Sequence, residues 1–290
     1  MKLIFHIDVN SAFLSWTACG LLEEGGADTP PTDIREIASV IGGSEKSRHG
    51  IVLAKSTLAK QYGIVTGEPL FQARRKCPGL VVVPPNYQLY VRKSDQLIRM
   101  LHEYTPLIQQ YSIDEAWMDM TGIQEAQADP MGFATGLKDR IHRELGFTVN
   151  IGISVNHLLA KMGSELQKPD RVHTLFPEEI PQKMWPLPVR DLLFLGKASE
   201  QKLIKAGIKT IGEMARYPET EIQRLLGEKT GHQLYEYANG RDDSPVRGER
   251  EEAKGYSAET TTEEDIVTYE QAFSLLLAQC DVVAARMRKD

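Results

Sequence analysis

The sequence predicts an α+β fold built on a ferredoxin-like split sheet and followed by a mostly helical segment. Three observations predict this fold class. Leu3 to Asp8 begins with an apolar run typical of a buried strand, and residues 107–113 form a second run of this kind. Residues 148–153 alternate apolar and polar side chains, which indicates a strand with one buried face. Helical periods lie between these strands, so the order of elements is that of a split βαβ sheet.

The first 84 residues are predicted to be irregular after the opening strand. Residues 24–34 contain two glycines, two prolines and three acids, which indicates a loop. Short strands are expected at 36–41, 50–54 and 80–83, and a short helix at 56–62. Glycines and a proline directly after residue 62 end that helix.

The next part of the chain carries stronger periodic signals. Apolar residues from Tyr90 to Tyr104 recur on one helical face, and Pro106 ends that helix. A hairpin follows, with strands at 107–113 and 116–120 and a turn between them. Residues 131–145 place an apolar side chain at every fourth position, which predicts an amphipathic helix.

Beyond residue 156 the chain is predicted to be mostly helical. A helix stopped by Pro169 comes first, and several short helices separated by glycines fill residues 190–240. The polar stretch 239–254 has the composition of a linker. A strand-like segment at 256–262 and a helix at 269–289 follow. One strand and one helix cannot bury a core alone, so we expect the chain to end inside a further domain.

Composition narrows the class of protein. Of the 290 residues, 41% are hydrophobic and 26% are charged, and no apolar run is long enough to span a membrane. The first residues show no cleavable signal pattern. Cys19, Cys77 and Cys280 lack metal-ligand spacing and are odd in number, so we expect reduced thiols in a cytoplasmic protein. We also expect a monomer. The net charge is −6, but residues 190–209 hold five bases against two acids and mark a local phosphate-binding face.

Three carboxylates stand at the ends of predicted core strands. Asp8 closes the first strand, and Asp114 and Glu115 follow the second. Neighbours in a strand point to opposite faces, so this pair addresses one site only if the backbone turns there. Carboxylates near a core are costly without a cation, and hard oxygen ligands suit Mg²⁺. Two such ions about 4 Å apart would catalyse phosphoryl transfer. The alternative is an exposed Asp-Glu turn, with Asp8 as a helix cap.

Three motifs resemble those of Y-family DNA polymerases, above all of their DinB or polymerase IV branch. The first motif runs from Phe5 to Phe13 (FHIDVNSAF), and the second from Ser112 to Ala116 (SIDEA). The third runs from Gly152 to Asp170 and contains Ala160-Lys161 and Gln167-Lys168-Pro169-Asp170. The resemblance extends from residue 2 to about residue 265. Three motifs in the family's order make it specific.

The resemblance implies domains and an activity. The implied domains are a catalytic palm at 1–12 and 80–170, fingers at 13–79, a thumb with a helix-hairpin-helix at 171–240, a linker at 241–254 and the incomplete start of a little-finger domain at 255–290. The implied activity is the addition of deoxynucleotides, supplied as triphosphates, to a primer on template DNA. Low-fidelity synthesis past damaged bases in DNA repair, and contact with a sliding clamp, belong to the same expectation.

Family roles carry over to the matching positions. Asp8, Asp114 and Glu115 would be the catalytic acids that hold two Mg²⁺ ions, and the backbone carbonyl of Val9 would complete a metal shell. Phe13 would be the steric gate, an aromatic ring that leaves no room for the 2′-hydroxyl of a ribonucleotide. The alternative for Phe13 is plain core packing.

The resemblance also implies contacts with the triphosphate. Lys168 would reach it; the alternative is a cation at a helix C-terminus. Thr57 and Lys60 stand where the family's fingers helix presents a tyrosine and an arginine, and Lys55 is a competing candidate. Lysine lacks the bidentate fork of arginine, so we expect altered binding geometry. Asn10 replaces a frequent aspartate, which removes a charge but not an expected metal ligand.

Residues 191–215 resemble a helix-hairpin-helix, which offers backbone N–H groups to a DNA phosphate. Its usual Gly-x-Gly is reduced to Gly196, and Lys197 would compensate electrostatically. The alternative is an ordinary helical hairpin with a solvated basic face. Two other functions stay open: a DNA-binding family member with weak catalysis, and a nucleotide cyclase, which uses a similar sheet. The intact acids argue against the first, and the long helical segment after residue 170 argues against the second.

Overall fold

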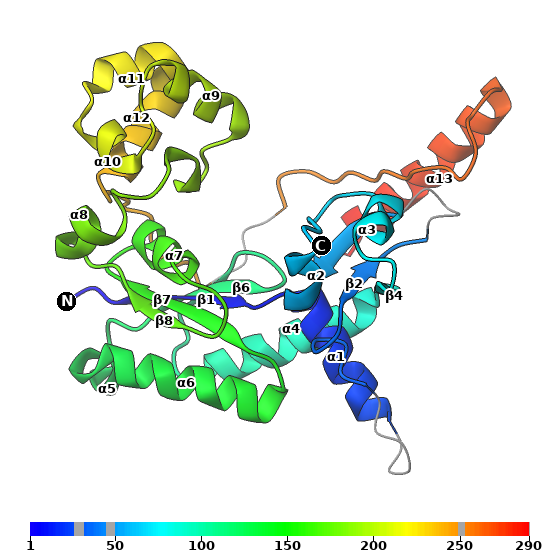
Figure 1. The fold of residues 1–290 in the computed structure, drawn as a ribbon, viewed down its shortest axis with the longest axis horizontal. Helices are drawn as coiled ribbons and strands as arrows, with labels where there is room; N and C mark the ends of the chain where they lie inside the picture. Colours follow the sequence, from blue (N-terminus) through cyan, green and yellow to red (C-terminus); the bar gives the residue numbers. More distant parts are fainter. Residues whose placement is uncertain (26–31, 45–49, 249–252, 290) are drawn as a thin grey trace. The chain divides into compact units, whose positions relative to one another are not determined.

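A computed structural model describes most of the chain (Figure 1). The described residues are 1–25, 32–44, 50–248 and 253–289. The loop predicted at 24–34 and the linker predicted at 241–254 lie partly outside these ranges. Within the described ranges, none of the helices combines the length and apolar character that crossing a membrane requires.

The chain divides into two compact units, each formed by two stretches of sequence. The first unit comprises Met1–Asn10 and Val91–Gly248, and the second comprises Ser11–Tyr90 and Glu249–Asp290. Both units contain helices as well as strands, so the predicted α+β class is confirmed.

The first unit is built on a five-stranded sheet. In spatial order its strands are β5 (Ile108–Gln110), β6 (Glu115–Asp119), β1 (Ile4–Val9), β7 (Val149–Ser154) and β8 (Val172–Thr174). β1 is antiparallel to both of its neighbours, and β8 runs parallel to β7. β5, β6, β1 and β7 have the predicted ferredoxin-like order. β8 is an extra edge strand that the sequence pattern did not predict, and β5 is shorter than the predicted 107–113.

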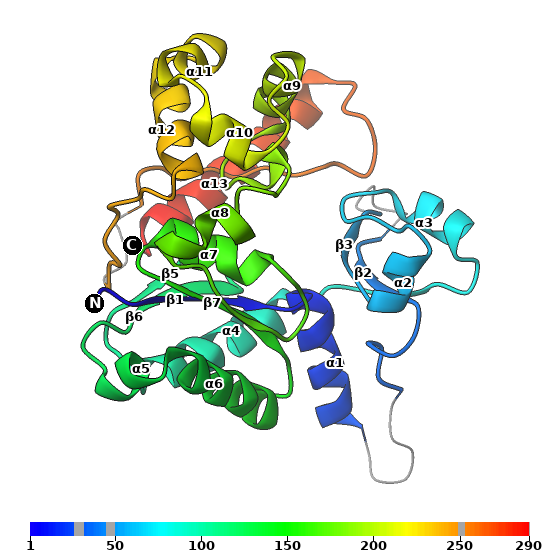
Figure 2. The same cartoon turned by 60° about the vertical axis from the view of Figure 1, so that its left-hand side comes forward.

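Helices cover both faces of this sheet. α7 (His157–Glu165) lies on one face, and α4 (Tyr87–His102) and α6 (Pro130–Leu145) lie on the other (Figures 1 and 2). All three helices match predictions. The short α5 (Gln124–Ala128) was not predicted. Asp129 directly precedes α6, and its side chain accepts a hydrogen bond from the Gly132 N–H, as an N-cap residue does.

The alternation in β7 predicts one buried face, and this prediction is wrong, because all six residues of the strand are buried. α7 covers the polar face. On that face the Asn150 side chain donates to the carbonyls of Ser164 (2.9 Å) and Gln167 (2.7 Å). The helix can approach this closely because of Gly152, where a Cβ would lie 1.9 Å from the carbonyl oxygen of Ala160. Polar residues in β7 therefore serve hydrogen bonds rather than solvent exposure.

Residues 177–240, the helical segment, belong to the same unit. The segment contains short 3₁₀ turns at Pro177–Glu179 and Val189–Asp191 and the helices α8 (Ile180–Lys183), α9 (Lys197–Lys205), α10 (Ile211–Arg216), α11 (Glu219–Leu226) and α12 (Glu228–Ala238). The predicted series of short helices is thus confirmed. Their apolar side chains share one core with Leu158, Leu159 and Met162 of α7. The segment is therefore anchored on the helix that also covers the sheet.

Residues 241–248 of the predicted linker are fastened to the first unit. The Asp242 carboxylate accepts a hydrogen bond from the Leu158 N–H at 3.2 Å, at the start of α7. Nδ1 of His157 donates to the Ser244 carbonyl at 2.8 Å. Val246 packs with a small apolar cluster on the sheet. Residues 241–248 are thus an ordered segment that is bonded to the start of α7 and packed on the sheet.

The second unit contains a small three-stranded sheet with the order β3 (Val52–Lys55), β2 (Ser39–Gly42), β4 (Val81–Val83) (Figure 2). The strands are shorter than predicted, and α2 (Thr57–Gln61) matches the predicted helix. α1 (Ala12–Glu24) and α3 (Leu70–Lys76) were not predicted. α1 is buried from several sides over its first nine residues, so its sequence shows no amphipathic period.

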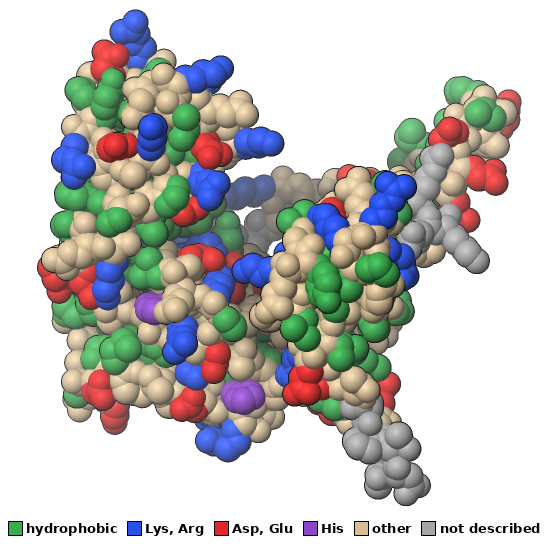
Figure 3. All heavy atoms as spheres, in the orientation of Figure 1, with side chains coloured by type: hydrophobic (Ala, Val, Ile, Leu, Met, Phe, Trp, Pro, Cys, Tyr) green, Lys and Arg blue, Asp and Glu red, His purple; other side chains and the backbone are tan. Residues whose placement is uncertain are grey.

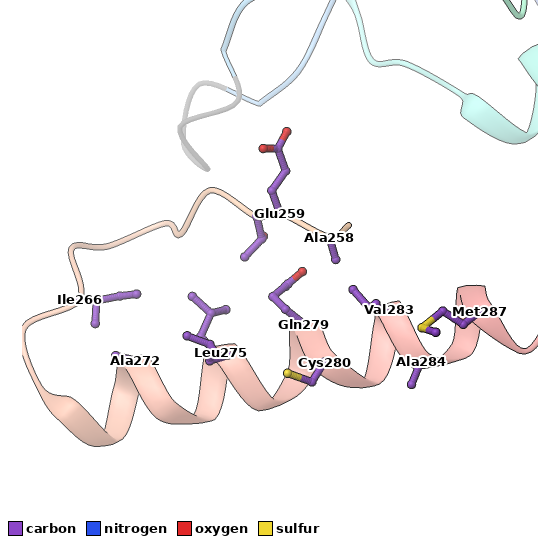
Figure 4. Close-up of a pocket in the computed structure, with 12 residues that line it drawn as sticks. Ala258, Glu259, Ile266, Ala272, Leu275, Gln279, Cys280, Val283, Ala284 and Met287 are labelled. Atoms are coloured by element: carbon purple, nitrogen blue, oxygen red, sulfur yellow. The ribbon is translucent and has the colours of Figure 1, made fainter. Parts of the chain in front are cut away.

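The second unit also contains α13 (Tyr269–Met287), which confirms the predicted C-terminal helix. The described part of the predicted strand at 256–262 is not a strand. α13 and the segment around Ala258 line a groove of about 710 Å³, toward which Leu275, Gln279 and Val283 point (Figure 4). No residue of α13 is buried. As the sequence predicts, this part of the chain does not bury a core by itself.

Candidate active site

The register of the central sheet brings two of the predicted acids together. β1 and β6 pair so that Asp8 lies directly opposite Glu115. Opposite residues of antiparallel strands share a face, with Cβ atoms about 5 Å apart. Glu165, in the last turn of α7, joins them, and one carboxylate oxygen from each residue lies within 4.8 Å of the others. The sheet and α7 thus build a cluster of three acids.

Two lysines compensate this acidic cluster. Nζ of Lys161 lies 2.5 Å from Oε2 of Glu115. Nζ of Lys168 lies 2.9 Å from Oδ1 of Asp8 and 2.8 Å from Oε1 of Glu165. Three carboxylates against two ammonium groups leave one net negative charge. One divalent cation would supply more positive charge than is needed to neutralise the cluster.

Burial and ion pairing act differently on the two paired acids. Burial raises the pKa of Asp8 to about 7, against the opposing effect of the Lys168 ammonium. Burial alone would also raise the pKa of Glu115, but the pKa is lowered to about 2, and the close partner that accounts for this is the Lys161 ammonium. Burial lowers the pKa of His6 to about 4, so this imidazole is neutral at pH 7. Ionised Asp8 is therefore the costly group of the cluster.

The cluster suits a magnesium ion on its own geometry. Its ligands are carboxylate oxygens, the hard donors that Mg²⁺ prefers. Nε2 of His6 is buried, lies 3.6 Å from Oε2 of Glu115 and has no hydrogen-bond partner in the described part of the chain. That distance is too long for a hydrogen bond. The three carboxylates therefore fit a cation that is bound by oxygen atoms, and His6 lies next to Glu115 without a hydrogen bond to it.

The third predicted acid, Asp114, lies beside this cluster but outside it. Its Oδ1 accepts a hydrogen bond from the Ser112 hydroxyl at 2.7 Å. Its backbone carbonyl accepts one from the N–H of Val9 at 3.1 Å, which closes the sheet next to Asp8. The structure thus brings Asp8 and Glu115 together, whereas the Asp114 carboxylate is held by its neighbour in the turn.

Glu165 and the role of Lys161 were missed in the sequence. The signal that could have found them is their spacing. Lys161, Glu165 and Lys168 are four and three residues apart, so Lys161 and Glu165 share one face of α7. Lys168 lies just beyond the helix end. Charged residues at this spacing on an otherwise apolar helix predict that one polar face of the helix contacts charged side chains.

Phe13, the predicted steric gate, lies in the first turn of α1 in the second unit. Its ring stacks on Tyr90, with centroids 4.4 Å apart and planes 8° apart. Tyr87 meets the Phe13 ring edge-on at 6.1 Å. The Phe13 side chain is only partly buried. One side of the Phe13 ring is therefore packed against other aromatic rings. A steric gate and an ordinary core residue would both be packed in this way.

The predicted fingers residues also lie in the second unit. Ser56 caps α2, and Thr57 and Lys60 are exposed on this helix, three residues apart. Nζ of Lys55 donates to the Thr66 hydroxyl at 3.1 Å. Burial and then repulsion by Lys60 lower the pKa of Lys55. Two lysines near one short helix give this surface a positive potential.

Gly196 and Lys197, the predicted DNA contacts, stand at the start of α9. Gly196 is the N-cap residue, and both residues are exposed. Phe194, which takes the place of the usual first glycine, has φ of +64° and is 57% exposed. All five basic residues counted between 190 and 209 are exposed. Figure 3 shows lysine and arginine side chains projecting from this part of the molecule.

Two family models match successive parts of the chain. Residues 7–165 match the model of the impB/mucB/samB family, and residues 190–242 match that of the DNA polymerase-iota thumb domain. A DNA polymerase IV from Clostridium acetobutylicum is 50% identical over 99% of this chain and 71% of its own length. A DNA polymerase IV from Moorella thermoacetica is 41% identical over 86% of this chain and 62% of its own length.

Solved structures show the same fold. A Y-family DNA polymerase chimera superposes with a TM-score of 0.74 at 20% identity, covering 88% of this chain and 71% of its own. DinB from Sulfolobus solfataricus superposes with a TM-score of 0.73 at 22% identity, covering 84% and 69%. Together with the family-model match and the 50%-identical relative, this fold defines a protein of the Y-family polymerase class. The chain belongs to the impB/mucB/samB family, and the predicted resemblance to DNA polymerase IV is confirmed.

Asp8→Asn is expected to stabilise the metal-free protein, more at pH 8 than at pH 5. The folded-state pKa of Asp8, about 7, lies above its ordinary value of 3.8. Between these values the folded state binds more protons than the unfolded state, so its stability falls as pH rises. The expected gain at pH 8 is on the order of 1 to 3 kcal/mol, measured by urea unfolding in EDTA.

The matched control for this measurement is Asp139→Asn, which changes an exposed acid on α6. We expect it to change stability equally little at the two pH values. A stabilisation by Asp8→Asn that is the same at pH 5 and pH 8, or a loss of stability at pH 8, would contradict the cost assigned to the buried carboxylate.

Proposed function

We propose that this chain is a DNA-directed DNA polymerase that adds deoxynucleotides to the 3′ end of a primer on a template strand. The observation that carries the proposal is the pairing of Asp8 with Glu115 across β1 and β6, with Lys161 and Lys168 compensating their charge. Curated relatives of this chain are named DNA polymerase IV, which supports the same activity. The reaction class is phosphoryl transfer, in which positioning and charge stabilisation dominate catalysis.

In this proposal the primer 3′-oxygen attacks the α-phosphorus of a bound deoxynucleoside triphosphate, and pyrophosphate leaves. Asp8, Asp114 and Glu115 would hold two Mg²⁺ ions, with the backbone carbonyl of Val9 as a further ligand. The bound ions would stabilise charge on the attacking and leaving oxygens. Oδ1 of Asp114 accepts the hydrogen bond from the Ser112 hydroxyl, so Oδ2 is the oxygen that would bind an ion.

The two lysines would then have different tasks. The Lys161 side chain is 10% exposed, and that of Lys168 is 32% exposed. Lys161 would keep Glu115 in place. Once cations neutralise Asp8, the Lys168 ammonium would be free to bind the triphosphate. Thr57 and Lys60, or alternatively Lys55, would also bind phosphate oxygens of the nucleotide.

The basic face at the start of α9 would bind the DNA backbone. Gly196 leaves its backbone open, since a Cβ there would have no neighbour within 4 Å among the described residues. Lys197 adds positive charge to a helix N-terminus, which attracts phosphate. Primer–template DNA and deoxynucleoside triphosphates are thus the proposed partners. The match of residues 190–242 to a polymerase thumb supports this function over a nucleotide cyclase.

We extend the proposal to low-fidelity synthesis past damaged template bases in DNA repair, which the family resemblance implies. The implied palm, fingers, thumb, linker and little-finger boundaries stay predictions. A monomeric state, a cytoplasmic location and contact with a sliding clamp also stay predictions of the sequence.

Asp114→Ala is expected to reduce primer extension on an undamaged template by on the order of a hundredfold to a thousandfold. The substitution removes a carboxylate from the proposed metal shell but leaves the DNA-binding face intact, so DNA affinity survives. Gel-based extension with Mg²⁺ and a DNA-binding assay measure the two effects. Asp95→Ala, which removes an exposed acid on α4, is the matched control.

Equal extension by wild type and Asp114→Ala would refute the assignment of Asp114. A wild-type chain that binds primer–template without extending it would instead support the DNA-binding member with weak catalysis.

Phe13→Ala is expected to raise the incorporation of ribonucleotides relative to deoxynucleotides by at least about tenfold, a change worth about 1.4 kcal/mol. The loss of the ring opens space beside the sugar, whereas Phe13→Tyr keeps the ring and should keep the selectivity. Single-nucleotide incorporation kinetics give the ratio. Unchanged selectivity in a folded Phe13→Ala chain would leave the stack on Tyr90 as the only role of this ring.

A further inference from the structure

Two buried asparagine side chains meet at the edge of the acidic cluster. Asn10 directly follows β1 and is 8% exposed, and Asn150 lies in β7 and is fully buried. Nδ2 of Asn10 donates a hydrogen bond to Oδ1 of Asn150 at 3.1 Å. A buried amide is destabilising unless its polar atoms form hydrogen bonds. The other hydrogen bonds of Asn10 and Asn150 therefore show which parts of the chain this pair connects.

Asn10 binds the backbone on the far side of Lys168. Its Oδ1 accepts hydrogen bonds from the Asp170 N–H at 2.9 Å and from the Thr148 hydroxyl at 3.0 Å. The Asp170 N–H lies 160 residues away in sequence and two residues beyond Lys168. Asn10 therefore joins the end of β1 to the loop that carries the proposed triphosphate ligand.

Asn150 binds the backbone on both sides of Lys168. Its Oδ1 also accepts a hydrogen bond from the Arg171 N–H at 3.2 Å. Its Nδ2 donates to the carbonyls of Ser164 and Gln167, the second of which immediately precedes Lys168. Together the two amides hold the backbone before and after this lysine.

These bonds fix the orientation of both amides. A flipped Asn150 would turn its NH₂ toward the Arg171 N–H and the Asn10 NH₂, so donors would face donors. A flipped Asn10 would do the same toward the Asp170 N–H. An aspartate in place of Asn10 could still accept from the Asp170 N–H, but it would set an oxygen against Oδ1 of Asn150 and leave that bond unmade.

We propose that the Asn10–Asn150 pair positions Lys168 for the triphosphate. The pair holds residues 167–171 so that the Lys168 ammonium stays between Asp8 and Glu165, where an incoming nucleotide would meet it. Asn10 and Asn150 act through the loop and are positioning residues. The part of this inference that concerns the nucleotide rests on the proposed function, since Lys168 is the proposed ligand.

The test uses the full chain without DNA and titrates it with dCTP and Mg²⁺ in a calorimeter. Asn10→Asp keeps the size of the side chain and is expected to weaken dCTP binding about tenfold, or about 1.4 kcal/mol. Lys168→Met should weaken binding at least as much. The double variant should bind no more weakly than Lys168→Met alone, because both changes remove the same contact.

Amide hydrogen exchange gives a readout that does not depend on the nucleotide. The N–H groups of Asp170 and Arg171 should exchange about tenfold faster in Asn10→Asp than in wild type, because the amides that hold them are loosened. The matched control is Asn239→Asp, which removes an amide donor to the Tyr235 carbonyl in the helical segment. This control should leave dCTP affinity and both exchange rates unchanged.

Steady-state kinetics separate positioning from general destabilisation. In primer extension, Asn10→Asp should raise KM for dCTP about tenfold and change kcat much less. Unchanged exchange at Asp170 and Arg171, or dCTP affinity equal to wild type, would overturn the inference. A wild-type chain that fails to extend primers would refute the proposed function instead, so the two failures are distinguishable.

Discussion

A carboxylate buried in the central sheet, that of Asp8, is the constraint on which the rest of this structure depends. β1 is flanked by strands on both sides and covered on both faces, so a charge at its end needs a partner brought from elsewhere. α7 and the residues just after it supply that partner in Lys168. The close approach of α7 to the sheet is possible because β7 has Gly152 at the point of contact.

The same helix joins the site to the helical segment. One face of α7 carries Lys161 and Glu165 toward the acids, while Leu158, Leu159 and Met162 pack into the core of residues 177–240. A change that moves α7 would therefore disturb the acidic cluster and the basic face of α9 together. This shared helix keeps the sheet and the helical segment in one compact unit.

Lys161 and Lys168 supply positive charge to the acidic cluster. Three carboxylates within 4.8 Å would repel one another strongly if nothing positive stood between them. Lys161 and Lys168 reduce this repulsion but leave the cluster with one net negative charge. A divalent ion would add two positive charges where Lys168 adds one, so on the proposed function metal binding would favour release of this lysine.

Much of the fold follows from local sequence, and much of the site does not. The apolar run before Asp8 and the acidic turn predict the central strands, and the motifs place Asp8 and Glu115 correctly at strand ends. α1 escaped prediction because its apolar residues surround the helix, and β8 because a three-residue edge strand has almost no period.

The contacts that complete the site join residues far apart in the chain. Glu165 becomes part of the acidic cluster only when α7 folds back onto β1. In the sequence, Asn10 is notable only because it replaces the family's frequent aspartate. In the fold, its amide forms hydrogen bonds with Asn150 and with the N–H of Asp170. Such roles depend on tertiary distances that no local pattern encodes.

The central claim is that Asp8 and Glu115 form one cation site. Binding of Mn²⁺, followed by electron paramagnetic resonance of the free ion, tests it most directly without reference to catalysis. We expect Asp8→Asn and Glu115→Gln each to weaken Mn²⁺ binding by at least about tenfold, and the double variant to bind more weakly than either single one. Mn²⁺ affinity that is unchanged by either substitution would contradict a shared site.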